Sequence, residues 1–240
     1  MKRILYILLG LLALASCQQF DTSECQGGEC ILELDVARAG RPTVASRAVD
    51  EDLAITILDA QGAEYCYYPA GSIPKKIVLE PGVFTVCAHT DNQASWHTAN
   101  SGKGEPCYFA STEVVMEYDH RTRISMEVPM VNYAVEVGLP EFFDNLFSAY
   151  RFSLKSGERE VVIQEGEKAY LDPARGGFYY SLSATNTDGV SHAHSPVWFF
   201  DVQSGKHYLL RYHYDSEAMS GSVEIEITND MDIDDTIVDL

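Results

Sequence analysis

Two histidines in the second half of the chain, His192 and His194, have a spacing that metal sites use. On a strand, residues two apart point to the same face, so both imidazoles could reach one ion. The pair lies between Gly189 and Pro196, however, and no cysteine or carboxylate follows at ligand spacing. We therefore expect two solvated histidines in a loop, and no metal site.

Three aspartates near the end of the sequence, Asp230, Asp232 and Asp234, have the spacing with which a calcium-binding loop begins. The sixth position of such a loop is glycine, because the chain turns sharply there, and here it is Asp235. Apolar residues alternate with polar ones just before this run. We expect a strand with a solvated acidic edge rather than a calcium site.

Motifs that carry catalysis are missing from the sequence. It contains no Gly-x-Ser-x-Gly, no His-Glu-x-x-His and no phosphate-binding glycine-rich loop. The 36 acidic residues leave paired carboxylates for glycoside cleavage open, since any one pair is unremarkable among so many. We expect a protein that is not an enzyme, with no catalytic residue, no cofactor and no bound metal.

Two polar loops combine groups that recognise sugars. The first holds Asp91, Asn92, Trp96 and His97, and the second holds Asn186 and Asp188. An aromatic ring stacks on the face of a sugar while amides and carboxylates bond its hydroxyls, so these residues form a candidate ligand loop. The alternative is that Trp96 closes the end of a hydrophobic core. We favour that alternative, because tryptophan is usually well buried.

The start of the chain has the pattern of an export signal. Lys2 and Arg3 precede an apolar run at residues 4–14, and Leu-Ala-Ser then leads into Cys17. The run is shorter than the about 20 apolar residues that span a bilayer. Small residues before a cysteine resemble the bacterial lipobox, which implies cleavage of a signal peptide, residues 1–16, and lipidation of the Cys17 sulfur. We expect a protein held on the outer membrane or cell surface by acyl chains.

The charge of the chain disfavours one class of partner, and its cysteines allow a disulfide. The formal net charge is −19, and removal of the signal makes it more negative, which disfavours nucleic acid. Cys25 and Cys30 flank a flexible Gln-Gly-Gly-Glu loop and could close a small disulfide. The pairing of the remaining cysteines, Cys66, Cys87 and Cys107, stays open.

A repeat divides the mature chain into two halves. Leu-Glu-Pro-Gly at residues 79–82 and Leu-Asp-Pro at residues 171–173 each lead into an alternating strand, then a polar loop, then a Pro-x-aromatic segment. The strand positions Phe84, Val86 and Ala88 would match Tyr180, Leu182 and Ala184 in the core. After these landmarks we expect a hairpin at residues 114–128 and another at residues 199–214.

Alternation of period two continues through most of the chain and no convincing helix is present. The fold class we expect is all-β, with two tandem antiparallel β-sandwich modules. A tether at residues 17–29 leads into module 1, residues 30–129, and module 2 follows at residues 130–240. The boundary near Pro129 has no Gly/Ser linker, so we expect the modules to be rigidly coupled.

These features together resemble a known family. The lipobox, Leu-Glu-Pro-Gly-Val-Phe-Thr-Val at residues 79–86, the loop with Trp96, Pro-Cys-Tyr-Phe at residues 106–109 and Gly-Lys-His-Tyr at residues 205–208 are similar to Bacteroidetes lipoproteins of domain of unknown function 4493. These resemble fimbrillin-like surface proteins and their anchors. The resemblance implies fimbrillin-like or transthyretin-like sandwiches with a structural or adhesive role, and a surface protein or a glycan as the partner. The alternative is a glycan-binding lipoprotein for nutrient capture.

Residues 37–52 interrupt the alternation and contain three arginines among small residues. So long a connection is unusual, and we expect an exposed loop. The resemblance to fimbrillins raises the hypothesis that cutting at Arg47 frees the strand before it for exchange with a neighbouring subunit. An ordinary crossover is the interpretation we favour, since a cut would also separate the protein from its anchor.

Overall fold

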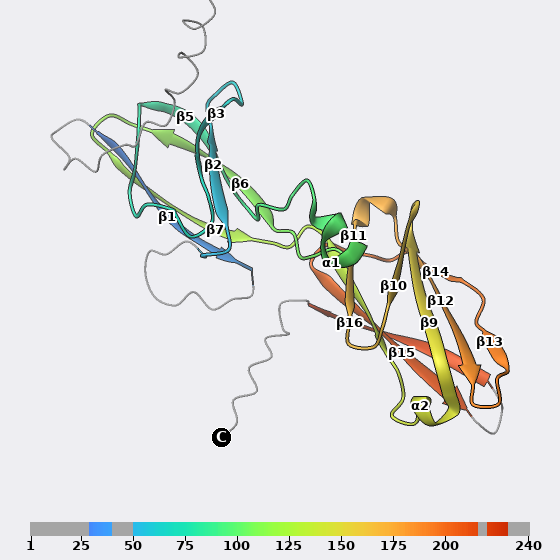
Figure 1. The fold of residues 1–240 in the computed structure, drawn as a ribbon. Coiled ribbons are helices and arrows are strands. Elements are labelled where there is room, and N and C mark those ends of the chain that lie inside the picture. Colours follow the sequence, from blue (N-terminus) through green and yellow to red (C-terminus); the bar gives the residue numbers. More distant parts are fainter. Residues whose placement is uncertain (1–28, 40–49, 216–219, 230–240) are drawn as a thin grey trace, which may run out of the picture.

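The computed structural model describes residues 29–39, 50–215 and 220–229, and these form two β-sandwiches that lie end to end (Figure 1). The predicted signal peptide, Cys17, Cys25 and the aspartates from Asp230 onward lie outside the described residues. Among the described residues, no helix is long and apolar enough to cross a membrane.

Module 1 consists of two sheets. The strands of the first, in spatial order, are β4 (Ile77–Leu79), β1 (Cys30–Arg38) and β7 (Arg121–Val128). The strands of the second are β3 (Glu64–Tyr68), β2 (Ala54–Leu58), β5 (Gly82–His89) and β6 (Phe109–Met116).

Module 2 repeats this strand order. Its first sheet has β11 (Lys168–Leu171), β8 (Tyr133–Gly138), β15 (Lys206–Asp215) and β16 (Ser220–Asn229). Its second has β10 (Arg159–Ile163), β9 (Phe147–Ser156) and β12 (Phe178–Asn186), with β13 (Ser191–Ala193) and β14 (Val197–Phe199) both paired to β12. Apart from the additional β16, each strand has its counterpart in module 1. This shared order is what the repeated landmarks predict.

The helices are short. They are α1 (Ala99–Gly102), α2 (Phe143–Leu146) and the 3-10 turns η1 (Trp96–Thr98) and η2 (Pro173–Arg175). The prediction of an all-β fold without substantial helix is therefore confirmed.

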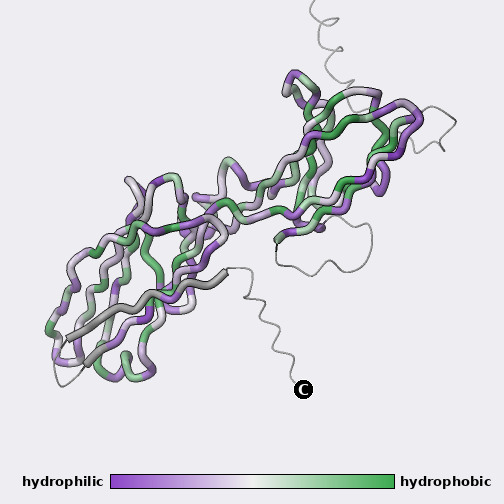
Figure 2. Tube along the Cα trace, turned by 180° about the vertical axis from the view of Figure 1, so that it is seen from behind, coloured by the Kyte–Doolittle hydropathy of each residue, from purple (hydrophilic) through white to green (hydrophobic). Residues whose placement is uncertain are grey.

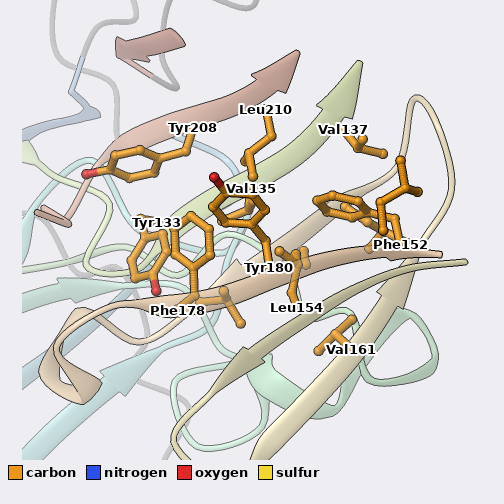
Figure 3. Close-up of a cluster of buried hydrophobic side chains, with 14 of the residues drawn as sticks. Tyr133, Val135, Val137, Phe152, Leu154, Val161, Phe178, Tyr180, Tyr208 and Leu210 are labelled. Atoms are coloured by element: carbon orange, nitrogen blue, oxygen red, sulfur yellow. The ribbon is translucent and has the colours of Figure 1, made fainter. Parts of the chain in front are cut away.

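Each module has its own hydrophobic core, because alternate residues of both its sheets point inward. Hydrophobic and hydrophilic residues alternate along the strands in Figure 2. In module 2 the rings of Tyr133, Phe178 and Tyr208 contact one another, with centroids 5.5 to 6.2 Å apart (Figure 3). The positions predicted to be equivalent are all buried: Phe84, Val86, Ala88, Tyr180, Leu182 and Ala184.

Two predicted hairpins are wrong. β6 pairs with β5 and β7 pairs with β1, so the turn at Asp119-His120 is a corner between the two sheets of module 1. In the same way β14 pairs with β12, and β15 pairs with β8 and β16 in the other sheet. The alternation on these strands fixes which face is buried but not which strand is the partner.

One parallel pair in each module also departs from the antiparallel expectation. β1 runs parallel to β7, and β8 runs parallel to β15. In both cases the first strand of the module lies beside one that the chain reaches only after building the second sheet. No short turn in the sequence marks such a long-range pairing, so alternation alone could not reveal it.

The first strand is also longer than expected. We predicted a loop beginning at Ala37, but β1 continues to Arg38. The Arg38 Nε atom lies 2.8 Å from Asp50 Oδ2, and its Nη2 donates to Asp52. The guanidinium also lies over the Tyr108 ring, 5.4 Å from its centroid. Both ends of the predicted loop are therefore fixed by one ion-pair network, and residues 40–49 lie outside the described residues.

Candidate functional site

The polar loop between β5 and β6 crosses from module 1 to module 2. Its backbone joins the second module directly, because Tyr170 N donates to Lys103 O at 2.8 Å and Val131 N donates to Cys107 O at 2.7 Å. The first of these bonds reaches β11, on the far side of the predicted boundary. Figure 1 shows α1, which belongs to this loop, beside β11. The loop is therefore part of the junction between the modules.

Asn132 fixes the loop from the side of module 2. Its side chain is 1% exposed and bonds the loop backbone twice. Oδ1 accepts from Cys107 N at 3.1 Å, and Nδ2 donates to Glu105 O at 2.8 Å. One amide thus satisfies a donor and an acceptor of an irregular segment that has no strand partner there.

Arg159 makes a second bridge across the junction. Nη1 donates to Tyr170 O at 2.6 Å in module 2, and Nη2 donates to Gly102 O in module 1. The guanidinium lies 5.6 Å from the centroid of the Trp96 ring, which is a cation–π geometry. Burial lowers the pKa of Arg159. The planar fork of arginine suits this role, since it reaches two carbonyls at once.

Gly104 allows the close approach of the two modules. Its φ of +87° lies in the left-handed region, which favours glycine. A Cβ there would lie 3.1 Å from Tyr170 O and 3.2 Å from both Trp96 O and Arg159 Nη2. Any side chain would therefore push the loop away from the second module.

An ion pair at the edge of the junction adds a further contact. Lys103 Nζ lies 2.6 Å from Glu167 Oε1, and the hydrogen bond from Lys103 lowers the pKa of Glu167. Both side chains are partly exposed, so water weakens the pair and it contributes little to stability.

A cleft of about 560 Å³ opens at this junction between the β5–β6 loop and the turns of module 2. Its lining combines an aromatic ring with charges of both signs: Gln93, Ala94, Trp96, His97, Ser156, Gly157, Glu158, Arg159, Leu171, Asp172 and Arg175. The volume is in the range of small-molecule sites. The lining could hold a polar ligand of one or two rings.

The structure separates the predicted ligand residues into those that line this cleft and those that do not. Trp96 and His97 line it. Trp96 is partly buried under Arg159, so it closes neither sandwich core, contrary to the alternative that we favoured. Asp91 accepts from the Tyr67 hydroxyl at 2.7 Å, and Asn92 Nδ2 donates to Pro106 O at 3.1 Å. These two polar groups hold the loop in shape.

The second predicted loop lies elsewhere. Asn186 Oδ1 accepts from Val190 N at 2.7 Å, which closes the β12–β13 turn around the exposed Asp188. Thr187 N donates to Leu146 O, beside α2. In Figure 1, α2 and β13 lie toward the end of module 2 that is remote from α1. The two loops occupy equivalent places in the repeat, but they do not form one site.

His192 was wrongly placed in a loop, whereas His194 does lie in the loop that follows β13. His192 belongs to β13 and pairs with Ala184 on β12. Its ring lies edge-on to Phe147, with centroids 6.1 Å apart. Among the described residues, no group of three or more histidine, cysteine or acidic side chains could hold a metal ion.

Cys66, Cys87 and Cys107 are free thiols, and Cys30 is buried at the start of β1. Since Cys25 lies outside the described residues, the proposed Cys25–Cys30 disulfide stays a prediction. Burial raises the pKa of the Cys66, Cys87 and Cys107 thiols, which makes them poor nucleophiles.

Sequence reasoning missed Asn132 and Arg159. Both act through contacts with residues far away in the chain, and neither stands in a recognisable motif. The absence of a Gly/Ser linker near Pro129 was the available signal. Where one strand leads directly into the next module, side chains must provide hydrogen bonds for the irregular backbone at the junction.

Comparison with models of protein families identifies the family of this chain. The family model described as domain of unknown function DUF4493 matches residues 28–240. The chain belongs to this family. A comparison with curated protein sequences finds no match.

Solved structures share the fold of this DUF4493 protein. A candidate cell adhesion protein from Bacteroides uniformis has a TM-score of 0.50 and 10% identity, over 84% of this chain and 98% of that chain. One from Bacteroides eggerthii has a TM-score of 0.49 and 11% identity, over 86% and 97%. The fimbrial anchor protein Mfa2 from Porphyromonas gingivalis has 0.43 and 12%, over 85% and 98%. At these identities the similarity concerns the fold alone.

Proposed function

We propose that this DUF4493 protein is a non-catalytic, lipid-anchored cell-surface protein with a structural or adhesive role, as an anchor or accessory subunit of a fimbria-like assembly. Membership of the family and the fold shared with the Bacteroides uniformis adhesion protein support the class. The lipobox that ends at Cys17 supports the anchor. The two domains of the proposal are modules 1 and 2.

The pairing of β1 with β7 is the observation that carries the proposal. Residues 31–38 pair in parallel with residues 121–128, and β1 is the middle strand of its sheet. A pull from an anchor at Cys17 enters module 1 at the start of β1. It leaves at the end of β7, where the chain passes into module 2.

Because the strands are parallel, these two forces slide β1 and β7 past each other along their axes. All the hydrogen bonds of the ladder then resist together, whereas pulling the strands apart from one end would break them one by one. The chain itself carries the tension on to module 2, and Asn132 and Arg159 hold the two modules together at the junction. A sandwich connected in this way suits a protein that holds something at a surface against drag.

Labelling in the native host tests the anchor. An alkyne fatty acid should mark the wild-type protein and Cys17→Ala should lose both the label and the membrane fraction. Cys25→Ala, a second cysteine of the tether, should keep both. Surface cross-linking followed by pull-down should recover other surface protein subunits. An unlabelled wild type contradicts the lipid anchor, and recovery of no surface protein contradicts the structural role.

Glycan binding for nutrient capture is a second candidate function. It is favoured by aromatic side chains that stay accessible, of which Trp96 lines the junction cleft. Titration with neutral oligosaccharides tests it, with the fluorescence of the tryptophan side chains as the reporter.

A further inference from the structure

The outer face of the second sheet of module 2 presents an exposed pair of aromatic rings. Tyr179 on β12 is directly paired with Trp198 on β14. Their ring centroids are 4.5 Å apart, and the side chains are 46% and 37% exposed. Their strand neighbours Phe178 and Phe199 point the other way and pack in the core. The rings thus lie side by side on the solvent face of the sheet.

The backbone beneath these rings is closely packed. Gly177, which precedes β12, has a φ of +131° and approaches β14 so closely that a Cβ would lie 2.1 Å from Phe199 O. Ser156 Oγ donates to Gly177 O at 2.7 Å from the adjacent β9. Phe200 follows β14 and is 73% exposed. We call Tyr179, Trp198 and Phe200 the aromatic platform. Its supporting strands are held in place before any ligand arrives.

Small hydroxyl side chains lie next to the platform on the same face. Ser181 and Ser183 follow Tyr179 at alternate positions of β12, and Ser153 is paired with Ser181 across β9. Alternate residues are about 6.8 Å apart along a strand and neighbouring strands about 4.8 Å apart. The serines therefore form a low shelf beside the taller rings, with donors and acceptors that point to solvent.

Charged side chains complete the row that contains the rings. Lys155 is paired with Tyr179, and Glu160 is paired with Lys155. Arg151 Nη2 lies 3.3 Å from Glu160 Oε1. With two positive and one negative side chain, this surface is slightly positive, although the protein as a whole is strongly acidic.

We propose that the aromatic platform and its serine shelf bind a neutral glycan. The C–H face of a sugar ring stacks on Tyr179 or Trp198, and its hydroxyls bond the serines and Lys155. Rings beside hydroxyls match this mixed surface. A stable protein interface buries about 800 Å² on each partner and has an apolar core. Three rings bordered by serines and charged side chains do not supply such a core. The acidic charge of the protein disfavours a polyanionic glycan.

The repeat offers an internal comparison. In module 1, the strand position equivalent to Tyr179 is Val83, and its cross-strand partner is Val115. Both valines are exposed, so at this position module 1 has the open face without the rings, and its own exposed rings lie elsewhere on the second sheet, at Tyr67 on β3 and Phe109 on β6. The shared strand pairing therefore does not require aromatic rings at this position, since module 1 has the same pairing without them.

The inference rests on the second candidate function, glycan binding, and assigns it to a site. The sequence contains two tryptophans, one at the platform and one at the junction cleft. Trp96→Phe leaves Trp198 as the sole indole reporter, and Trp198→Phe leaves Trp96. Fluorescence titration of these full-length variants with cellohexaose, xylohexaose and mannohexaose distinguishes the two places.

We expect the emission of Trp96→Phe to change with at least one of these hexaoses and not with polygalacturonate. For that hexaose, Trp198→Ala and Tyr179→Ala should each raise the Kd measured by calorimetry about tenfold. Val83→Ala, at the same place in module 1, should leave it unchanged. Circular dichroism checks that the variants fold, as exposed substitutions usually do.

Two results would overturn the proposal. A response from Trp96 in Trp198→Phe, without one from Trp198 in Trp96→Phe, would move glycan binding to the junction cleft and leave the second candidate function standing. Absence of response from both reporters with all three hexaoses would remove the platform and the glycan function together.

Discussion

Replacement of Asn132 by alanine is a direct test of the junction. The substitution removes the acceptor for Cys107 N and the donor for Glu105 O. Cys107 is buried, so its amide loses its partner without gaining water. Glu105 is partly exposed, and its carbonyl can turn to solvent instead.

The expected cost follows from these two environments. A buried amide left unsatisfied costs about 1–3 kcal/mol, and loss of a partly exposed hydrogen bond costs about 0.5–1.5 kcal/mol. Together they lower the free energy of unfolding by about 1.5–4.5 kcal/mol. That is a large share of the about 5–15 kcal/mol that stabilises an ordinary domain.

Urea denaturation in the Trp198→Phe background measures this effect, since Trp96 at the junction is then the reporter. Asn132→Ala should lower the urea midpoint of the Trp96 signal. Asn145→Ala replaces an exposed asparagine of module 2 and should change the free energy of unfolding by less than about 0.5 kcal/mol. If the two variants unfold at the same urea concentration, Asn132 does not hold the junction.

Three further outcomes follow from the same contacts. Arg159→Met keeps a chain over Trp96 but loses both carbonyl bonds, and calorimetry should show a lower melting temperature than for Arg151→Met, whose ion pair is exposed. Trypsin should cut within residues 40–49 and spare Arg38; the amino-terminal fragment should then co-elute with the rest under native conditions, since β1 stays paired on both sides. In force spectroscopy, module 1 should unfold at a higher force when pulled by the start of β1 and the end of β7 than when pulled by β3 and β7. Equal unfolding forces would contradict the sliding geometry.

Alternation predicted the faces of the strands well, because burial depends on local sequence. Ile55 and Ile57 point into the core of module 1, and Phe152 and Leu154 do so in module 2. The same pattern could not predict the partner strand. Val114 and Met126 are buried on strands that the sequence joins by a short turn, yet the strands belong to opposite sheets. A hairpin and a corner between sheets place the same side chains inside.

The candidate site was less predictable than the fold. Trp96 lines the junction cleft, and its role in binding a ligand stays a prediction; its neighbours Arg159 and Gly104 come from distant or unremarkable positions. The sequence did not single out Tyr179 or Trp198, because their pairing follows only from the register of β12 with β14. Exposed aromatics on a strand look like core residues until the inward positions are known. The decisive information in both cases is which strands are neighbours.

The repeat explains why binding and anchoring can occupy different parts of this molecule. Both modules use the first and the last of their shared strands as a parallel pair in the first sheet, and the aromatic platform lies on the second sheet of module 2. Module 1 lies between the predicted tether and the junction, and any pull on the anchor passes through it. Module 2 carries aromatic rings where module 1 has Val83 and Val115, on a face that the tension does not cross. A ligand at Tyr179 and Trp198 would therefore load the parallel pair of module 1 through the chain that joins the modules, while Asn132 and Arg159 keep the modules aligned at the junction.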